Sequence, residues 1–296
     1  MDPWGEEELE PTFGELLQAQ SGDLLLFAAY AALVLVSFGL RRGPTWLKYV
    51  TLLATIGYMG IYKSQILSIV NVYSLITWNL PILQYSLGWY FFAIFTLAAT
   101  FVWGRLYCGR MCAFGALTQL IDRVFPRRWR VNVPLRIERK ANYIKYGMLV
   151  GVLAYFLATQ HIEAFKYVEP FWMFTGQGTM PLWIGIGVLL TASVFVSNLY
   201  CRFLCPVGAF LGVISSATTA LRIKRWAECR TCRLCEKTCD WGAIVGPKII
   251  KSECVRCDAC ERLYANQAKC PHHLIIIRKA DIMARRSVAP AATVGR

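Results

Sequence analysis

The chain has 296 residues, with 32 Lys and Arg against 18 Asp and Glu, and its formal net charge is +14. Hydrophobic residues make up 56% and charged residues 17%, against roughly 45–50% and 25% in a soluble globular domain. The excess of hydrophobic residues lies in uncharged blocks of about 17–20 residues, close to the length of a membrane span. This composition excludes a purely soluble enzyme.

Five of these blocks are predicted to be transmembrane helices. Each is near the ~20 residues that cross a ~30 Å hydrocarbon core. The five ranges are Leu24–Leu40, Trp46–Ile61, Trp89–Trp103, Tyr143–Thr159 and Leu182–Asn198. A sixth apolar stretch, Ile66–Tyr85, contains Asn71, Asn79 and Pro81. We expect it to be interfacial or re-entrant, because irregular backbone at membrane depth must be covered by protein.

The distribution of basic residues predicts the orientation of these spans. Residues 41–48, residues 105–145 and the region from Tyr200 onward together carry 30 of the 32 Lys and Arg. Basic residues gather on the cytoplasmic side, so we expect a periplasmic N-terminus, a cytoplasmic C-terminal region and the bacterial inner membrane. The acidic tail 1–23 lacks the basic start of a cleavable signal peptide, so the first span is expected to be retained. The basic residues then indicate contact with membrane lipid, and no nucleic-acid partner is expected.

An internal repeat is visible in the spans. Arg105-Leu-Tyr-Cys-Gly-Arg-Met-Cys112 aligns with Asn198-Leu-Tyr-Cys-Arg-Phe-Leu-Cys205. Two copies in the same orientation imply a pseudo-two-fold axis along the membrane normal. The predicted fold is thus a membrane all-α protein with five transmembrane helices and a parallel repeat, followed by a small α+β ferredoxin-like domain. Its parts are the acidic tail 1–23, an extra helix 24–40, repeats 41–122 and 143–221 joined by a basic linker 123–142, the ferredoxin-like domain 222–280, and a basic tail 281–296.

Eight of the 12 cysteines form two runs near the C-terminus. They are Cys229-x2-Cys232-x2-Cys235-x3-Cys239 and Cys254-x2-Cys257-x2-Cys260-x9-Cys270. The triplet spacing lets one turn hold three corners of a 4Fe–4S cubane, and in two-cluster ferredoxins the fourth thiolate comes from the other run. We therefore assign one cluster to Cys229, Cys232, Cys235 and Cys270, and a second to Cys254, Cys257, Cys260 and Cys239.

These runs depart from the usual ferredoxin pattern in two places. Asp240 follows Cys239 where Pro is usual, and nine residues separate Cys260 from Cys270 instead of three. Structural zinc is the alternative, since Cys-x2-Cys pairs also bind zinc. Two triplet-plus-one runs favour iron–sulfur clusters. Disulfides are not expected in the reducing cytoplasm.

The other four cysteines are the two pairs within the repeat, and two interpretations of them stay open. Residues at i and i+4 share one helical face, and the repeat symmetry would bring Cys108, Cys112, Cys201 and Cys205 together. They could then hold an iron–sulfur cluster or another metal, or act as a redox dithiol. The alternative is that they are small buried hydrophobic residues at tight helix turns.

Histidine and loop carboxylates give weaker signals. The three His include no pair facing the membrane interior, so a bis-His haem within this chain is excluded. His161 is expected to be an interfacial hydrogen-bonding residue. Glu163 and Glu169, in the second outer loop, are expected to be solvated, with a proton relay as the alternative.

The cysteine motifs resemble those of the NosR/NirI and NapH family of polytopic iron–sulfur proteins. The residues that carry the resemblance are Tyr200-Cys-Arg-Phe-Leu-Cys-Pro-Val-Gly-Ala209 and Glu253-Cys-Val-Arg-Cys-Asp-Ala-Cys260, together with Lys269-Cys-Pro271. The likeness covers Trp46 to Pro271, and the nine-residue gap before Cys270 is closer to the NosR type. One departure is Ala113 after Cys112, where the family has Pro.

The resemblance implies a role in respiratory electron transport. Family members carry electrons between the quinone pool or other membrane donors and periplasmic reductases, and nitrous oxide reductase is the partner of NosR. NosR-type proteins also carry a periplasmic flavin domain, where this chain has only its tail 1–23. The resemblance therefore implies FMN on a partner subunit, flavin- or haem-containing redox subunits, a periplasmic reductase, and quinone as a further candidate ligand.

The sequence thus predicts an integral-membrane electron-transfer subunit. It would pass electrons between cytoplasmic 4Fe–4S clusters and a quinone or flavin carrier, as a component of an oxidoreductase complex with no bond-making chemistry of its own. Two alternatives remain. One is a redox-sensing regulatory membrane protein, with the tail 281–296 as its output segment. The other is a metal-maturation reductase, in which the four membrane thiols bind copper and the clusters reduce it.

Overall fold

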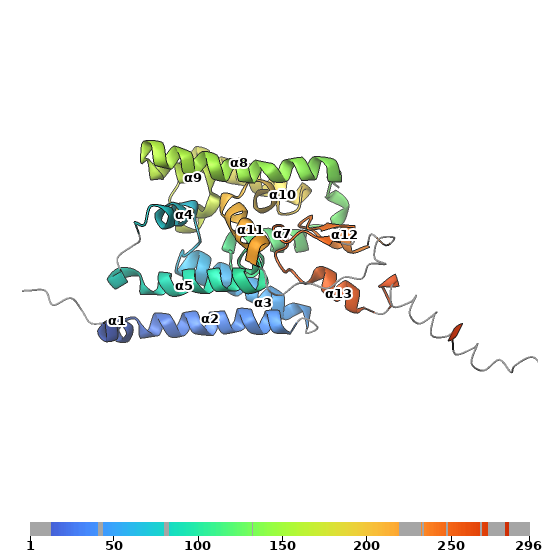
Figure 1. Ribbon diagram of the computed structural model, residues 1–296, viewed down its shortest axis with the longest axis horizontal. Coiled ribbons are helices and arrows are strands. Elements are labelled where there is room, and N and C mark those ends of the chain that lie inside the picture. The colour runs from blue at the N-terminus through green and yellow to red at the C-terminus, as the bar shows by residue number, and fades with distance from the viewer. Residues whose placement is uncertain are drawn as a thin grey trace, which may run out of the picture.

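The computed structural model describes residues 13–40, 44–79, 83–131, 133–218, 232, 234–246, 248–266, 268–271 and 282–283. Several expectations lie outside these residues: the first part of the acidic tail, the ligand Cys229, and nearly all of the basic tail 281–296. The described chain is mostly helical, and its longest helices run side by side along one axis of the molecule (Figure 1).

Five helices overlap the five expected spans. They are α2 (Ser21–Gly39), α3 (Thr45–Thr55), α5 (Leu83–Trp103), α8 (Leu135–Thr159) and α10 (Met180–Phe195). Ala, Leu and aromatic residues fill their interiors, and helices that are apolar on all faces are buried in protein or in lipid. Two helical stretches, Ser21–Gly39 and Lys140–Thr159, are long and apolar enough by themselves to cross a membrane.

The helices differ from the expected spans at several ends, and α5 begins at Leu83 instead of Trp89. α8 begins at Leu135, so the last part of the expected linker 123–142 is helical. α10 ends at Phe195, and the expected final residues of that span lie beyond it. α3 continues without a break into a π-helical segment, η1 (Ile56–Tyr62). Hydrophobicity sets where a span lies, but local hydrogen bonding sets where its helix ends.

The stretch expected to be interfacial or re-entrant is a short helix between irregular segments. α4 (Ile69–Ile76) is capped at its N-terminus by Ser68, whose hydroxyl accepts a hydrogen bond from the Val70 N–H at 3.2 Å. The side chain of Asn71 accepts in return from the Ser68 N–H at 2.9 Å. These two bonds satisfy N–H groups that the first turn leaves free. Three more short helical turns lie in the segment between α8 and α10. They are η3 (Ile162–Ala164), α9 (Phe165–Val168) and η4 (Pro170–Thr175).

Both Cys-x3-Cys motifs lie at breaks between two helices. Cys108 is on α6 (Leu106–Arg110), and Cys112 is the residue before α7 (Ala113–Val124). Cys201 is on a π-helical turn, η5 (Tyr200–Leu204), and Cys205 precedes α11 (Pro206–Thr218). The expectation that each pair shares one face of a continuous helix is therefore wrong. The chain turns between the two thiols of each pair.

The cysteine-rich domain is a small α+β unit at one end of the helical bundle (Figure 1). It contains α12 (Leu234–Thr238), β1 (Ile244–Val245), β2 (Lys248–Ile249) and α13 (Ala259–Ala265). The strands form an antiparallel pair in which Ile244 faces Ile249. This agrees with the expected ferredoxin-like character. One buried core joins the domain to the bundle, since it contains Trp241 and Val255 together with helical residues.

Candidate metal centres

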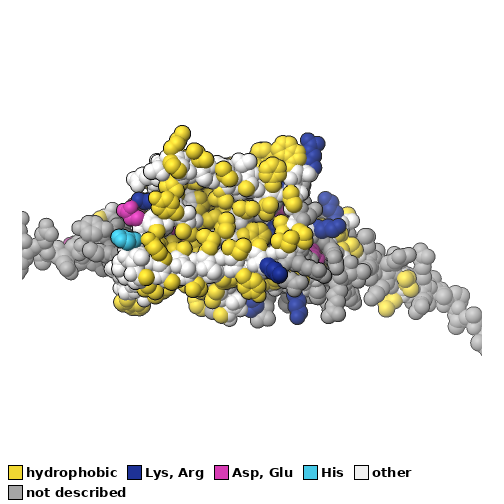
Figure 2. All heavy atoms as spheres, turned by 90° about the horizontal axis from the view of Figure 1, so that it is seen from above, with side chains coloured by type: hydrophobic (Ala, Val, Ile, Leu, Met, Phe, Trp, Pro, Cys, Tyr) yellow, Lys and Arg dark blue, Asp and Glu magenta, His cyan; other side chains and the backbone are white. Residues whose placement is uncertain are grey.

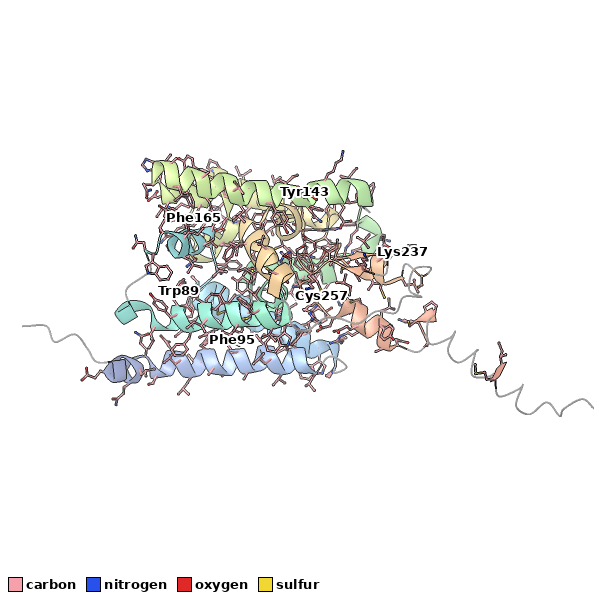
Figure 3. The ribbon with its side chains drawn as sticks, viewed as in Figure 1. Trp89, Phe95, Tyr143, Phe165, Lys237 and Cys257 are labelled. Atoms are coloured by element: carbon pink, nitrogen blue, oxygen red, sulfur yellow. The ribbon has the colours of Figure 1, made fainter. Side chains whose placement is uncertain are left out.

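Four cysteines from the two C-terminal runs line a single cavity. Cys239 follows α12, Cys254 and Cys257 lie on the loop before α13, and Cys260 is on α13. Positive φ values at Arg256 (56°) and Asp258 (63°) turn this loop around the cavity. Figure 3 labels Cys257 where the domain meets the bundle. The set of four is the one that the sequence assigned to the second cluster.

Backbone N–H groups point at the thiols of this cavity. Trp241 and Ala243 donate to Cys239, and Arg256 donates to Cys254. Burial nevertheless raises the pKa of Cys254 to about 11 and the pKa of Cys239 to about 12. Such thiols stay protonated at neutral pH unless a bound metal supplies positive charge, and metal binding releases their protons. N–H donors around a set of four thiols fit a bound iron–sulfur cluster, whose potential they would tune.

Structural zinc is the alternative occupant of this set of thiols. Zinc draws four donors to about 2.0–2.3 Å from one point. Among the residues that the structure describes, no three His, Cys, Asp or Glu side chains are arranged to hold one ion in this way. The four thiols line one cavity instead.

The ligand set of the other expected cluster is described only in part. Cys235 lies on α12, Cys232 and Cys235 are half-buried, and Cys270 is 7% exposed. Cys229 lies outside the described residues. The set Cys229, Cys232, Cys235 and Cys270 therefore stays a prediction.

The four cysteines of the Cys-x3-Cys motifs come together inside the bundle. Cys108, Cys112, Cys201 and Cys205 are each 5–7% exposed and belong to one buried core. The other three lie close enough to Cys201 for charges on the thiols to interact. A metal centre would supply the positive charge that four thiolates at this depth require.

An arginine that sequence reasoning missed lies beside these thiols. Arg105 is 1% exposed, and its Nη2 donates to Cys108 Sγ at 3.9 Å. Its Nη1 donates to the Ser252 carbonyl at 2.8 Å and lies 3.4 Å from a Glu253 oxygen. The Nε of Arg105 has no hydrogen-bond partner among the described residues. A buried cation with a free donor fits an anionic thiolate centre. The signal in the sequence was its place three residues before Cys108.

The second outer loop holds a buried carboxylate, which corrects the expectation for Glu169. This residue is 1% exposed and accepts hydrogen bonds from the Ile69 N–H at 2.8 Å and the Ser68 hydroxyl at 2.5 Å. Burial raises its pKa to about 7. Glu163, by contrast, is exposed as expected, with 90% of its side chain in solvent. The sequence of this loop does not show which of its carboxylates accepts hydrogen bonds from the N-terminus of α4.

Comparisons with known proteins match the segments that contain these cysteines. A family model described as a 4Fe-4S binding domain matches residues 85–132 and again residues 178–225, so each match contains one Cys-x3-Cys motif. A second model, named NosR, matches residues 227–281, which contain the two C-terminal cysteine runs. No solved structure matches the chain.

Three curated relatives illustrate the likeness. "Regulatory protein NosR" of Pseudomonas aeruginosa is 33% identical over 73% of this chain and 32% of its own length. "Protein NirI" of Paracoccus denitrificans is 32% identical over 64% of this chain and 28% of its own. "Putative electron transport protein YccM" of Escherichia coli is 32% identical over 64% of this chain and 55% of its own. The chain spans about a third of the length of the NosR and NirI relatives that it matches. With its matched cysteine motifs and its helical architecture, the chain belongs to the NosR/NirI-type 4Fe–4S proteins.

Proposed function

We propose that the chain is an integral-membrane electron-transfer subunit. The observation that carries this proposal is a continuous buried core that contains both the four thiols of the bundle and Val255, which lies between two thiols of the cavity. Redox centres held in one packed core exchange electrons without bond-making chemistry. The protein would hold the centres and tune their potentials by charge, burial and hydrogen bonds to sulfur.

In this proposal the eight C-terminal cysteines hold two 4Fe–4S clusters. The cavity of Cys239, Cys254, Cys257 and Cys260 supports one of them. The ligands of the other would be Cys229, Cys232, Cys235 and Cys270. A further iron–sulfur centre would bind the four thiols of the bundle, which is supported by their shared burial and by the family model that matches both segments.

The surface supports a membrane location with five spans. Large hydrophobic side chains are exposed on all five long helices, for example Leu25, Leu53, Phe101, Val150 and Val188. Exposed apolar patches on this scale mark a membrane or another protein. Figure 2 shows hydrophobic side chains over the middle of the molecule and Lys and Arg gathered toward the end of the cysteine-rich domain. This polarity supports a cytoplasmic position for that domain, in the bacterial inner membrane.

The proposal implies a redox partner on each side of the membrane. A low-potential one-electron donor would reduce the clusters on the cytoplasmic side. On the other side a quinone, or a flavin- or haem-containing subunit, would accept the electrons and deliver them to a periplasmic respiratory reductase.

The equal spacing of the two Cys-x3-Cys motifs also supports a parallel repeat of the membrane segments, 41–122 and 143–221.

The test is EPR spectroscopy of the reduced protein, purified anaerobically in detergent, with iron and acid-labile sulfide counted per chain. We expect signals of reduced 4Fe–4S clusters from the C-terminal domain and an additional iron–sulfur signal from the four bundle thiols. A protein that binds zinc and shows no iron–sulfur signal would contradict the proposal.

A regulatory role is the second candidate, and the name of the relative "Regulatory protein NosR" favours it. In that case the clusters would sense redox state and signal through a partner. A chain that loses electron transfer but retains its regulatory effect after replacement of Cys108 by Ala would support this second candidate.

A further inference from the structure

The loop of the cavity lies directly against the first Cys-x3-Cys motif. Gly109 lies between Cys108 and Cys112, Val255 lies between Cys254 and Cys257, and both are buried. A Cβ atom on Gly109 would overlap the Val255 carbonyl oxygen and lie 3.4 Å from Val255 Cβ. Only glycine allows two backbones to approach this closely.

Polar contacts hold this loop in place on both sides of Val255. The buried ion pair of Arg110 and Asp258 joins the motif to the loop, and both side chains are fully buried. On the other side, Arg105 contacts the Ser252 carbonyl. The Arg256 Nε donates to the Trp103 carbonyl at 2.9 Å. Buried ion pairs and hydrogen bonds across such a contact favour one arrangement of the parts that they join.

The second Cys-x3-Cys motif contacts the segment that follows Cys239, one of the thiols of the cavity. Arg202, next to Cys201, forms an ion pair with Glu138. Gly242, three residues after Cys239, has a φ of +63°, and a Cβ there would overlap both members of this pair. Both motifs therefore contact loops that carry thiols of one cavity.

We propose that the cluster held by Cys239, Cys254, Cys257 and Cys260 is the immediate electron partner of the centre at the four bundle thiols, with the contact of Gly109 and Val255 as the crossing point. This inference rests on the proposed function, which supplies both centres. Val255 and the four thiols share one apolar core, so packed protein fills the space between them. In each crossing one electron leaves the cubane, which is oxidised, and reduces the iron–sulfur centre in the bundle, while no bond forms or breaks. A low-potential one-electron donor then restores the cubane.

The experiment compares Gly109→Ala with a matched control, Gly151→Ala. A Cβ at Gly151, on the exposed part of α8, would meet no atom within 4 Å. Each protein is mixed with titanium(III) citrate as the one-electron reductant and freeze-quenched at a series of times for EPR. Iron content and the equilibrium EPR spectrum report whether all centres are bound.

In wild type and in Gly151→Ala we expect the bundle centre to be reduced rapidly after the cubane. In Gly109→Ala, with all centres present, we expect its reduction to be several-fold slower, because the loop must move away. Reduction at the wild-type rate in Gly109→Ala would overturn the inference.

A second measurement applies even where Gly109→Ala fails to assemble. In the fully reduced wild-type protein, two neighbouring paramagnetic centres broaden or relax each other's EPR signals, and we expect this magnetic interaction. If the EPR signals of both centres are present but show no magnetic interaction, the inference is overturned and the proposed function is left intact. The absence of iron–sulfur signals would overturn both.

Discussion

The two Cys-x3-Cys motifs have the same cysteine spacing, yet they contact the cysteine-rich domain in different ways. In the first motif Gly109 brings backbone against backbone at Val255. In the second motif the contact is made by the Arg202 side chain, paired with Glu138 beside Gly242. The spacing of the cysteines determines where the thiols lie. The residues between them determine how each motif meets the cavity.

Burial also differs between the two contacts. The side chains of Arg110 and Asp258 are fully buried, whereas those of Arg202 and Glu138 are 10% and 7% exposed. A charge left without its partner costs more free energy when water cannot reach it. The first contact should therefore tolerate change less well than the second.

The largest effects are expected from removal of a thiol. Cys254→Ala should lose the EPR signal and the iron of one 4Fe–4S cluster, because the cavity loses a ligand. Cys108→Ala should retain the signals of both C-terminal clusters and lose only the bundle centre. A Cys108→Ala protein with an unchanged spectrum and iron content would contradict a centre at the four bundle thiols.

The next effect distinguishes the two motif contacts. Arg110→Met leaves Asp258 as a buried unpaired charge and should lower the free energy of unfolding by about 3–5 kcal/mol. Arg202→Met should lower it by less, because the Glu138 side chain is 7% exposed whereas that of Asp258 is fully buried. Denaturation in detergent, followed by cluster absorbance, measures both. Equal losses in the two variants would contradict the difference in burial.

A smaller effect concerns the outer loop and depends on pH. Burial raises the pKa of Glu169 from 4.5 to about 7, so the folded protein binds this proton more tightly than the unfolded chain does. Its contribution to stability is fully present below about pH 4.5 and is lost as pH rises to about 7, a change of roughly 3 kcal/mol. Glu169→Gln should remove this pH dependence.

The matched control is Glu163→Gln, whose carboxylate is exposed. A pH series of denaturation midpoints should be the same for this control and for wild type. If Glu169→Gln retains the wild-type pH dependence, a group other than Glu169 causes it, and the prediction is wrong.

The smallest effect is expected at the exposed pair of Lys166 and Glu163, whose side chains are 40% and 90% exposed. Lys166→Met should change the free energy of unfolding by at most about 0.5 kcal/mol. The same denaturation assay measures it. A loss as large as that of Arg110→Met would show that burial does not govern these ion pairs.

Much of the architecture could be predicted from the sequence. Runs of apolar residues predicted the positions of five helices, and Asn71 and Pro81 indicated the short irregular segment between two of them. The spacing of Cys254, Cys257 and Cys260 predicted a shared site, and the exchange of fourth ligands placed Cys239 with them. These features depend on local spacing, which a sequence displays directly.

Features that depend on tertiary contact could not be predicted. The helix break at Cys112 was missed, because equal spacing fits a continuous helix as well as a turn. Arg105 and Glu169 were not identified as buried, since nothing local shows that Glu253 and Ile69 lie beside them. The role of Gly109 likewise depends on a loop that lies far away in the sequence.

Electron transfer across a sealed membrane tests the central claim most directly. The protein is reconstituted in proteoliposomes with its cysteine-rich domain outward, a membrane-impermeant low-potential donor is added outside, and reduction of an impermeant acceptor inside the vesicle is followed. We predict that wild type reduces the enclosed acceptor and that Cys108→Ala, with its C-terminal clusters intact, does not. Equal rates of acceptor reduction with wild type and with Cys108→Ala would contradict a path through the bundle thiols.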